Sequence, residues 1–313
     1  MNDKKIIPIF FSCDDKYAPF AGITIYSLLE NASKDYLYEI YVLNMGLCDE
    51  YKSTIKRLER DNATISFVDV TEQMKKFSVA LNLRDYYTAA IYFRIFIPEL
   101  FPQYDKGIYL DSDMVVLSDI SKLYEVDLGD NLVGATKDQV IYSRELFKDY
   151  ATLGVGVHFS EYFNSGMLLM NLSLMREVGL ENQFVDTFNT YHFEVVCPDQ
   201  DYLNVLCYGK VLHLSIGWNK MSVDMDYEGV PDIIHYNMFN KPWQMDGVPY
   251  GEYFWEYASK TEFYAHALSV KESFTEEEAL AQEKGVEELC NSMVRIIESD
   301  YNFKKIIFDK KGE

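Results

Sequence analysis

The chain has 313 residues, of which 48% are hydrophobic and 25% are charged, ordinary values for a globular protein with a sizeable core. Its 50 acidic residues outnumber 29 basic ones, which gives a net charge of −21. A field of this sign repels a polyphosphate backbone, so we expect no nucleic acid among its partners. A phosphate-bearing substrate would need a bound cation or a few local basic groups.

Cysteine content and the N-terminus indicate the compartment. The five cysteines are odd in number and include no C-x-x-C pair, which argues against a disulfide framework and against a cysteine zinc site. The first apolar run, of about eight residues, is too short for a signal-peptide core, and no run approaches the ~20 residues of a membrane span. We therefore predict a soluble, cytoplasmic protein without a transmembrane segment.

The N-terminal part of the chain predicts alternating strands and helices. Apolar runs predict strands at Ile6–Cys13, Glu39–Leu43 and Thr64–Val68, separated by helices at Phe20–Asn31 and around Glu50–Asp61. This order is typical of the α/β class, with a doubly wound, Rossmann-like sheet and flanking helices. Ligands of such sheets bind beyond the carboxyl ends of the strands, where an acidic pair directly follows the first strand.

The central part continues the pattern. The further predicted elements are a helix at Asp85–Phe96 closed by Pro98, strands at Gly107–Leu110, Leu132–Ala135 and Phe163–Asn171, and a helix at Gln200–Tyr208. Neither an internal repeat nor a low-complexity linker interrupts them. One catalytic domain over residues 1–245 is the simplest division.

Residues 246–313 have a different composition. Glu272–Glu283 is rich in Glu and Ala, and Gly285–Ser299 has amphipathic spacing. We expect a small helical C-terminal appendage that packs on or flanks the catalytic domain. Its basic residues leave peripheral contact with the inner face of a membrane as an open alternative, but they are mixed with many Glu and Asp, which favours a solvated helix.

The most informative motif is Asp111-Ser112-Asp113, which directly follows the predicted strand Gly107–Leu110. Two carboxylates one residue apart at the exit of a buried strand repel each other unless a cation lies between them. Carboxylate oxygens are the ligands preferred by Mg²⁺ and Mn²⁺, and such a metal stabilises charge on a departing diphosphate. A bare D-x-D sequence is common by chance, but the apolar residues on both sides favour a metal site over a surface loop.

A phosphatase is the main alternative for this motif. Asp-x-Asp-x-Val after an apolar strand also matches the nucleophile loop of haloacid-dehalogenase-like phosphatases, in which the first Asp is phosphorylated. That fold places the loop on an early strand and needs a downstream G-D-x-x-x-D motif. Here the loop follows three predicted strands, and no such motif comes after it. A second alternative is a protein that binds a UDP-sugar without catalysing its transfer.

Several separated blocks together resemble glycosyltransferase family 8, which includes bacterial lipopolysaccharide galactosyl- and glucosyltransferases and glycogenin. The blocks are Phe11–Tyr17, Ala90–Arg94, Tyr109–Val116, Tyr162–Leu172, Pro198–Asn204, Ile234–Tyr236 and Lys241–Trp243. The resemblance implies a GT-A fold, a UDP-hexose donor carrying galactose or glucose, Mn²⁺ (with Mg²⁺ as a substitute) and a retaining mechanism. It also implies a saccharide, glycolipid or glycoprotein acceptor.

The resemblance also implies residue roles. The metal ligands would be Asp111, Asp113 and His235, and the groups beside the anomeric carbon would be Asp199 and Gln200. The expected substrate-binding residues are Asp14, Tyr17, Arg94, Ser112, Asp138, Asn164, Gly166 and Lys241. Two carboxylates, one imidazole and diphosphate oxygens form an octahedral shell suited to Mn²⁺.

The chain departs from the family pattern at two positions. Met238 stands where the family often has Gly, three residues after the His, and Lys16 follows the acidic pair where galactosyltransferases tend to have Asn. Neither change removes an expected metal ligand. Since residue 200 is Gln rather than Glu, a front-side mechanism looks easier than a covalent glycosyl-enzyme, but the sequence leaves both open.

Overall fold

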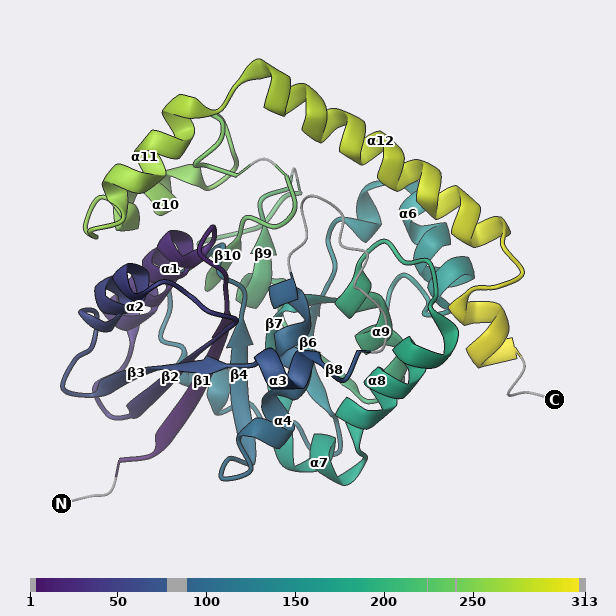
Figure 1. The fold of residues 1–313 in the computed structure, drawn as a ribbon, viewed down its shortest axis with the longest axis horizontal. Coiled ribbons are helices and arrows are strands. Elements are labelled where there is room, and N and C mark those ends of the chain that lie inside the picture. Colours follow the sequence, from purple (N-terminus) through teal and green to yellow (C-terminus); the bar gives the residue numbers. More distant parts are fainter. Residues whose placement is uncertain (1–3, 78–88, 224, 240, 310–313) are drawn as a thin grey trace.

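The computed structural model describes residues 4–77, 89–223, 225–239 and 241–309. A seven-stranded sheet lies at the centre, with the strand order β3-β2-β1-β4-β7-β6-β8, and helices cover both of its faces (Figure 1). A second, three-stranded sheet has the order β5-β10-β9. The predicted α/β class with a Rossmann-like sheet is confirmed.

The N-terminal elements follow the predicted alternation. They are β1 (Ile6–Ser12), α1 (Ala18–Asn31), β2 (Leu37–Asn44), α2 (Asp49–Lys56), β3 (Ala63–Asp69) and α3 (Thr71–Met74). Helix α2 ends at Lys56, earlier than the predicted Asp61. The reason is local, because Arg60 and Ala63 exchange backbone hydrogen bonds and so begin the turn into β3.

The segment before the second half of the sheet differs from the prediction. Residues 85–88 of the predicted helix lie outside the described residues, and Ala89–Phe96 is a 3-10 helix, η1. Pro98 does not close it, because the chain continues into α4 (Ile97–Leu100) with Pro98 in its first turn. Proline is tolerated there, since the first backbone N–H groups of a helix have no partner inside it.

The elements around the later strands bring the site residues into place. In chain order they are β4 (Lys106–Leu110), β5 (Met114–Val116), α5 (Ser121–Tyr124), β6 (Val133–Lys137), η2 (Ile141–Ser143), α6 (Glu145–Asp149), η3 (Tyr150–Val155), β7 (Phe163–Asn171), α7 (Leu172–Glu177), α8 (Leu180–Tyr191), α9 (Pro198–Leu206), β8 (Val211–His213), η4 (Ile216–Asn219), β9 (Lys220–Met221) and β10 (Ile233–His235). The sequence pattern missed the short strands β5, β8, β9 and β10, since two or three residues carry no periodicity.

Strand direction changes in the middle of the large sheet. β1 runs parallel to β2 and to β4, whereas β7 is antiparallel to both of its neighbours, β4 and β6. A long apolar run such as Phe163–Asn171 predicts a buried strand but not its direction. Because β2 and β4 flank β1 on opposite sides, the crevice at the carboxyl ends of β1 and β4 is the switch point where α/β sheets bind ligands.

The two faces of the sheet carry two hydrophobic clusters. Phe10 of β1 and Tyr109 of β4 face one cluster, whereas Ile9, Phe11 and Ile108 face the other. This division follows the alternation of side chains along a strand. Because both faces are covered, the central strands β1 and β4 are apolar almost throughout, as the sequence indicated, whereas the edge strand β3 has exposed Thr64 and Ser66.

The C-terminal helices are α10 (Gly251–Ala258), α11 (Tyr264–Ser273), α12 (Glu276–Glu298) and the π-helix η5 (Lys304–Asp309). α10 and α11 lie over α1 (Figure 1). On the same side, the Phe20 ring of α1 stacks on the ring of Trp243, which precedes α10, with 4.0 Å between the ring centroids. α12 crosses the top of the molecule and runs unbroken through Gly285. The domain division at residue 245 stays a prediction.

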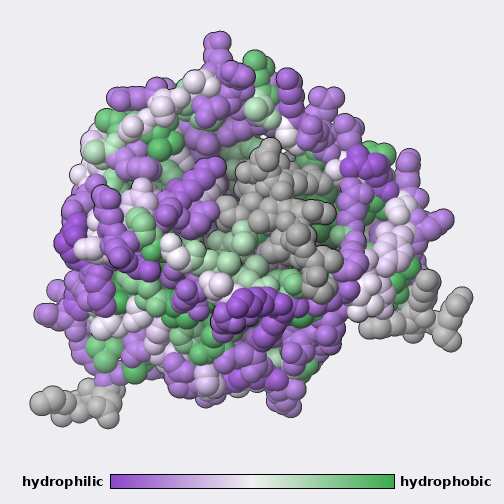
Figure 2. All heavy atoms as spheres, viewed as in Figure 1, coloured by the Kyte–Doolittle hydropathy of each residue, from purple (hydrophilic) through white to green (hydrophobic). Residues whose placement is uncertain are grey.

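The visible surface is mainly hydrophilic. Figure 2 shows hydrophilic side chains over most of the visible face, with hydrophobic groups gathered toward its centre. Within the described ranges, none of the helices combines the length and the apolar run that crossing a bilayer requires. All five cysteines lie among the described residues, and none of them forms a disulfide bond.

Candidate functional site

The site lies where β1 and β4 end side by side. Asp111 directly follows β4, and Asp113 directly precedes β5. The Ser112 hydroxyl donates a hydrogen bond of 2.8 Å to the Ser12 carbonyl at the end of β1, which joins the two strand ends. His235 ends β10 and pairs with Met114 of β5, so the small sheet carries the imidazole to the two carboxylates.

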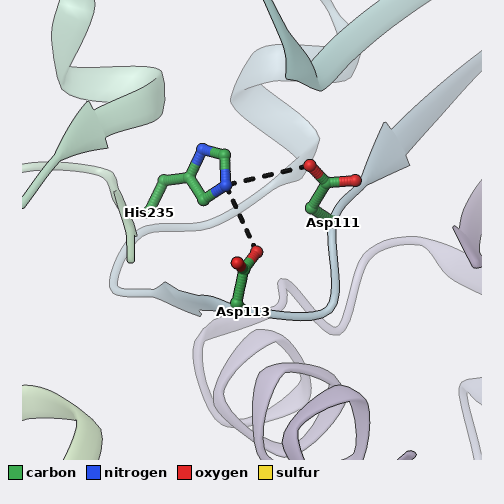
Figure 3. Close-up of side chains that lie close together, drawn as sticks. All are labelled: Asp111, Asp113 and His235. Atoms are coloured by element: carbon green, nitrogen blue, oxygen red, sulfur yellow. Dashed lines mark ion pairs between the residues drawn. The ribbon is translucent and has the colours of Figure 1, made fainter. Parts of the chain in front are cut away.

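Asp111, Asp113 and His235 form the metal-site cluster. His235 Nε2 lies 3.2 Å from Asp113 Oδ1 and 3.8 Å from Asp111 Oδ2, and one ligand atom from each residue lies within 4.8 Å of the others. Figure 3 shows this ring nitrogen facing both carboxylates. Among the described residues, this is the only group of three or more His, Cys, Asp and Glu side chains with metal-binding spacing.

Gly166 of β7 lies directly against the side chains of His235 and Asp111. A Cβ at this position would lie 2.4 Å from His235 Cε1 and 2.7 Å from Asp111 Oδ2, both well inside van der Waals contact. The Gly166 carbonyl also accepts a 2.8 Å hydrogen bond from the Asp111 backbone N–H. Glycine is therefore required here for a close approach between backbone and side chains.

Two buried basic side chains neutralise the carboxylates. Arg94 donates to Asp111 Oδ1 at 2.8 Å and stacks over the Tyr109 ring, 4.3 Å from its centroid. Lys241 donates to Asp113 Oδ2 at 2.5 Å and to the Tyr236 carbonyl at 2.6 Å. Each carboxylate thus has one oxygen on a basic side chain and the other facing His235.

These ion pairs control the protonation states. Burial opposes ionisation of Asp113, yet Lys241 and His235 hold the pKa of this carboxyl well below its usual range. Burial also opposes the charge of Lys241, but Asp113 raises the lysine pKa above its ordinary value. At neutral pH the cluster therefore presents an ionised Asp113, the form that binds a metal ion.

Asp138, Asn164, Gln200 and Asn219 form a second group, the amide network. Gln200 Oε1 accepts from Asn164 Nδ2 at 2.9 Å and from the Ser165 backbone N–H at 3.0 Å. Gln200 Nε2 donates to Asp138 Oδ2 at 3.0 Å and to the Tyr162 hydroxyl at 3.2 Å. All four hydrogen-bonding positions of the Gln200 amide are thus occupied by protein groups.

Asp199 links the two groups of residues. Its Oδ2 accepts from the Ser165 hydroxyl at 2.9 Å and lies 3.2 Å from Arg94 Nε. Burial raises the pKa of Asp199, and the positive charge of Arg94 partly offsets this effect. Arg94 therefore lies between two carboxylates, Asp111 and Asp199, at the centre of the site.

The predicted nucleotide-binding residues lie on the α1 side. Asp14 Oδ1 accepts from the Tyr17 backbone N–H at 3.0 Å just before α1 begins. Lys241 Nζ lies 5.8 Å from the centroid of the Tyr17 ring and 5.7 Å from that of the Trp243 ring. The lysine therefore connects this side of the site to the metal-site cluster.

The structure brings every predicted site residue to this region, although their roles stay predictions. Sequence reasoning missed other members, namely Tyr109, Tyr162, Ser165, Asp201 and Asn219. Tyr109, Ser165 and Asp201 adjoin motifs that the sequence did reveal. Asn219 adjoins none, and only the pairing of β9 with β10 brings it to His235.

Comparison with known proteins places this geometry in context. Residues 8–247 match the family model described as glycosyl transferase family 8. The chain belongs to this family. It is a glycosyltransferase, and this membership decides against the phosphatase interpretation.

Curated relatives agree with the family. The chain is 29% identical over 221 residues to a putative glycosyltransferase of Haemophilus influenzae, with 70% of this chain and 64% of that protein covered. It is 28% identical to general stress protein A of Bacillus subtilis, with 84% and 96% covered. It is also 25% identical to the lipopolysaccharide 1,2-glucosyltransferase of Escherichia coli, with 78% and 74% covered.

Solved structures support the GT-A fold. The galactosyltransferase LgtC, crystallised with donor and acceptor sugar analogues, has a TM-score of 0.69 and 27% identity, with 82% of this chain and 96% of LgtC covered. The bifunctional glycosyltransferase WbbM has a TM-score of 0.75 and 27% identity over 87% of this chain. This chain covers 53% of WbbM, about half of its length.

Proposed function

We propose that this glycosyltransferase moves a hexose, galactose or glucose, from a UDP-sugar to a hydroxyl of a saccharide, glycolipid or glycoprotein, with retention at the anomeric carbon. The observation that carries the proposal is the metal-site cluster at the switch point of the sheet. LgtC, which binds donor and acceptor sugar analogues, and the glucosyltransferase from E. coli support a sugar donor and a saccharide acceptor.

The metal-site cluster fits a hard divalent cation. Asp111 and Asp113 offer carboxylate oxygens and His235 offers Nε2, a mixed oxygen and nitrogen set suited to Mn²⁺, with Mg²⁺ as a substitute. Gly166 leaves room for these side chains to converge. When bound, Mn²⁺ would supply a Lewis acid that stabilises negative charge on the departing diphosphate.

The basic side chains complement the cation. Lys241 is the point charge that would bind the diphosphate, since its ammonium already lies at the cluster next to the Tyr17 ring. Asp14 and Tyr17 would hold the uracil, and Ser112, which lies at the strand ends, would contact the donor there. This arrangement lets a chain of charge −21 accept an anionic donor.

The residues beyond the cation would hold the sugar. Arg94, Asp138, Asn164 and Gly166 would bind its hydroxyls or lie against its ring, and Asp199 would orient hydroxyls already in the ground state. Gln200 would support the anomeric centre by fixing its neighbours, since its own amide is fully bonded within the protein. These bonds favour a front-side route over attack by residue 200.

A donor screen tests the proposal. UDP release would be measured from UDP-glucose, UDP-galactose, UDP-N-acetylglucosamine and UDP-N-acetylgalactosamine, with Mn²⁺, with Mg²⁺ and with EDTA. We expect release with one of the hexose donors, dependent on the metal. Release that is unchanged in EDTA would contradict the metal assignment. Turnover of p-nitrophenyl phosphate that is lost in Asp111→Asn would instead support the phosphatase.

Calorimetry gives an independent measurement. We expect Mn²⁺ to strengthen UDP binding at least about tenfold, because Arg94 and Lys241 only balance the two carboxylates and a bound cation adds the positive charge that attracts the diphosphate. Equal UDP affinity in EDTA and in Mn²⁺ would refute this expectation.

We also propose that residues 1–245 are the catalytic domain and that residues 246–313 form a helical region packed on it. Contacts of α10 and α11 with α1 support this division. The exposed N-terminal half of α12, with Glu276, Glu277 and Glu278 in its first turn, favours a solvated helix.

A further inference from the structure

One continuous path of hydrogen bonds joins the metal-site cluster to the amide network. His235 Nδ1 lies 2.9 Å from Asn219 Oδ1, and Asn219 Nδ2 donates to Asn164 Oδ1 at 2.9 Å. Asn164 Nδ2 in turn donates to Gln200 Oε1 at 2.9 Å. Asn219 is completely buried, and it is the member of the amide network that bonds to His235 in this path.

Backbone N–H groups fix the orientation of the Asn164 and Gln200 amides, and that of the Asn219 amide follows from them. The Gly166 N–H donates to Asn164 Oδ1 at 3.0 Å, and the Ser165 N–H donates to Gln200 Oε1, so both of these atoms must be oxygens. The Asn219 atom that meets Asn164 Oδ1 must therefore be the NH₂ group. Its other end is then the oxygen, and it faces His235 Nδ1.

This orientation determines the tautomer of the metal-site histidine. An amide oxygen accepts and cannot donate, so His235 Nδ1 must carry the proton that lies between it and Asn219 Oδ1. Nε2 is then the ring nitrogen that faces Asp113 and Asp111, and in the neutral imidazole it offers its lone pair to a cation at this position. Three acceptor atoms that converge in this way are stabilised by a cation, and a neutral imidazole is the form that ligates metals.

We propose that Asn219 is a positioning residue that fixes His235 in its metal-binding tautomer and couples metal binding to the amide network. The proposal rests on the proposed function only in taking His235 as a metal ligand. The position follows from the fold, because Asn219 ends η4 immediately before β9, and β9 pairs with β10 so that Met221 lies opposite His235.

Metal affinity tests the first half of the proposal. Free Mn²⁺ would be measured by electron paramagnetic resonance during titration of the full chain, with and without UDP. We expect Asn219→Leu, which removes both bonds at similar volume, to weaken Mn²⁺ binding about 10- to 100-fold. Asn302→Leu is the matched control, since Asn302 is a buried asparagine that bonds to Ile296 and Leu153 and not to the path; its Mn²⁺ affinity should stay within twofold of wild type.

The second half needs a variant that separates the two bonds. In Asn219→Asp the carboxylate still accepts from His235 Nδ1, so Mn²⁺ affinity should stay within about threefold of wild type. The same carboxylate cannot donate to Asn164 Oδ1 and repels it, so kcat should fall at least about tenfold. Thermal midpoints of all variants would be recorded, so that the effects are compared among folded proteins.

The outcomes separate the two proposals. If wild type fails to bind Mn²⁺, the metal assignment of the proposed function is wrong. If wild type binds Mn²⁺ and folded Asn219→Leu binds it equally well, the tautomer role of Asn219 is overturned. If Asn219→Asp keeps both its Mn²⁺ affinity and the wild-type kcat, Asn219 does not couple the two groups.

Discussion

The two halves of the site are built in opposite ways. In the metal-site cluster the bonds are ionic, and Lys241 and Arg94 occupy carboxylate oxygens that a metal ion could also use. In the amide network the bonds are directional, and the Gln200 and Asn164 amide oxygens already accept from backbone N–H groups, which can only donate. The carboxylates of the metal-site cluster can therefore exchange one cationic partner for another, whereas the amides of the network cannot change partners without breaking hydrogen bonds.

This difference suggests separate roles for the metal-site cluster and the amide network. Ionic pairs tolerate replacement of one cation by another, so the cluster can take up a charged ligand without unfolding its surroundings. A fully bonded amide network is costly to rearrange, because each broken bond leaves a buried polar group without a partner. The network is thus suited to preorganise the surface that we propose binds the sugar, and the cluster to respond to binding.

The largest effect is expected for a substitution that removes the charge of one carboxylate of the metal-site cluster. Asp113→Asn should lower the transfer rate about 1000-fold or more, since the metal loses an anionic ligand and its Lewis-acid contribution. Initial rates at saturating donor and Mn²⁺ would measure it. Asp105→Ala is the control, because this carboxylate is 91% exposed and far from the site in the sheet register. Transfer within tenfold of wild type would show that Asp113 is not needed for the chemistry.

The next test removes the side chain of Gln200, which has four hydrogen bonds within the amide network and to its neighbours. Gln200→Ala should lower kcat about 10- to 1000-fold with little change in donor KM, because in the proposed mechanism this residue acts on the transition-state geometry. It should also lower the free energy of unfolding by about 1–3 kcal/mol, since Asp138 and the Ser165 N–H lose a partner. Gln183→Ala, at an exposed glutamine on α8, is the control.

The structure separates this role from helix capping. It is Asp201, rather than Gln200, whose carboxylate bonds back to the Cys197 N–H at the start of α9. A Gln200→Ala protein that melts early but transfers sugar at the wild-type rate would refute the positioning role and leave only a structural one.

A third test adds a methyl group at Gly166, which lies between the metal-site cluster and the amide network. Gly166→Ala should reduce transfer about 10- to 100-fold, because its methyl group displaces His235 and Asp111 by a fraction of an ångström or more. Transfer assays and the Mn²⁺ titration would measure the loss. Gly251→Ala, where a Cβ meets Pro242 at an ordinary 3.5 Å, should change neither quantity. Full activity of Gly166→Ala would mean that His235 and Asp111 can move away from the added methyl group without loss of function.

The smallest expected effect concerns the far end of the network, where Tyr162 donates to Asp201. Burial raises the pKa of Asp201 to about 6, above its value in the unfolded chain. The folded state therefore holds a proton that the unfolded state has lost between about pH 4 and 6. Relative to Asp201→Asn, the wild-type free energy of unfolding should fall by at most about 1.4 kcal/mol per pH unit as the pH rises through this window.

Urea unfolding of both proteins between pH 4.5 and 7.5 measures this difference. A difference that instead grows with pH would mean that the four donors around Asp201 (Tyr150, Tyr162, Val196 and Cys197) stabilise its ionised form in the folded state.

The sequence determined much of the fold and the chemistry. Apolar runs located the strands that carry the site, because a strand buried on both faces must be apolar almost throughout. The pair Asp111 and Asp113 at the exit of such a strand indicated a cation, since two adjacent carboxylates need one. The blocks around Asn164, Gln200 and His235 indicated a glycosyltransferase, and the family match confirms this class.

Only the tertiary structure decided how these parts meet. The antiparallel direction of β7, the short strands β9 and β10, and the position of Asn219 leave no mark in a periodic pattern. The orientation of the amides, and with it the tautomer of His235, depends on backbone N–H groups of Ser165 and Gly166. Residue types set which bonds a side chain can form, but hydrogen bonds are short-range and directional, so their partners exist only once the strands have been brought together.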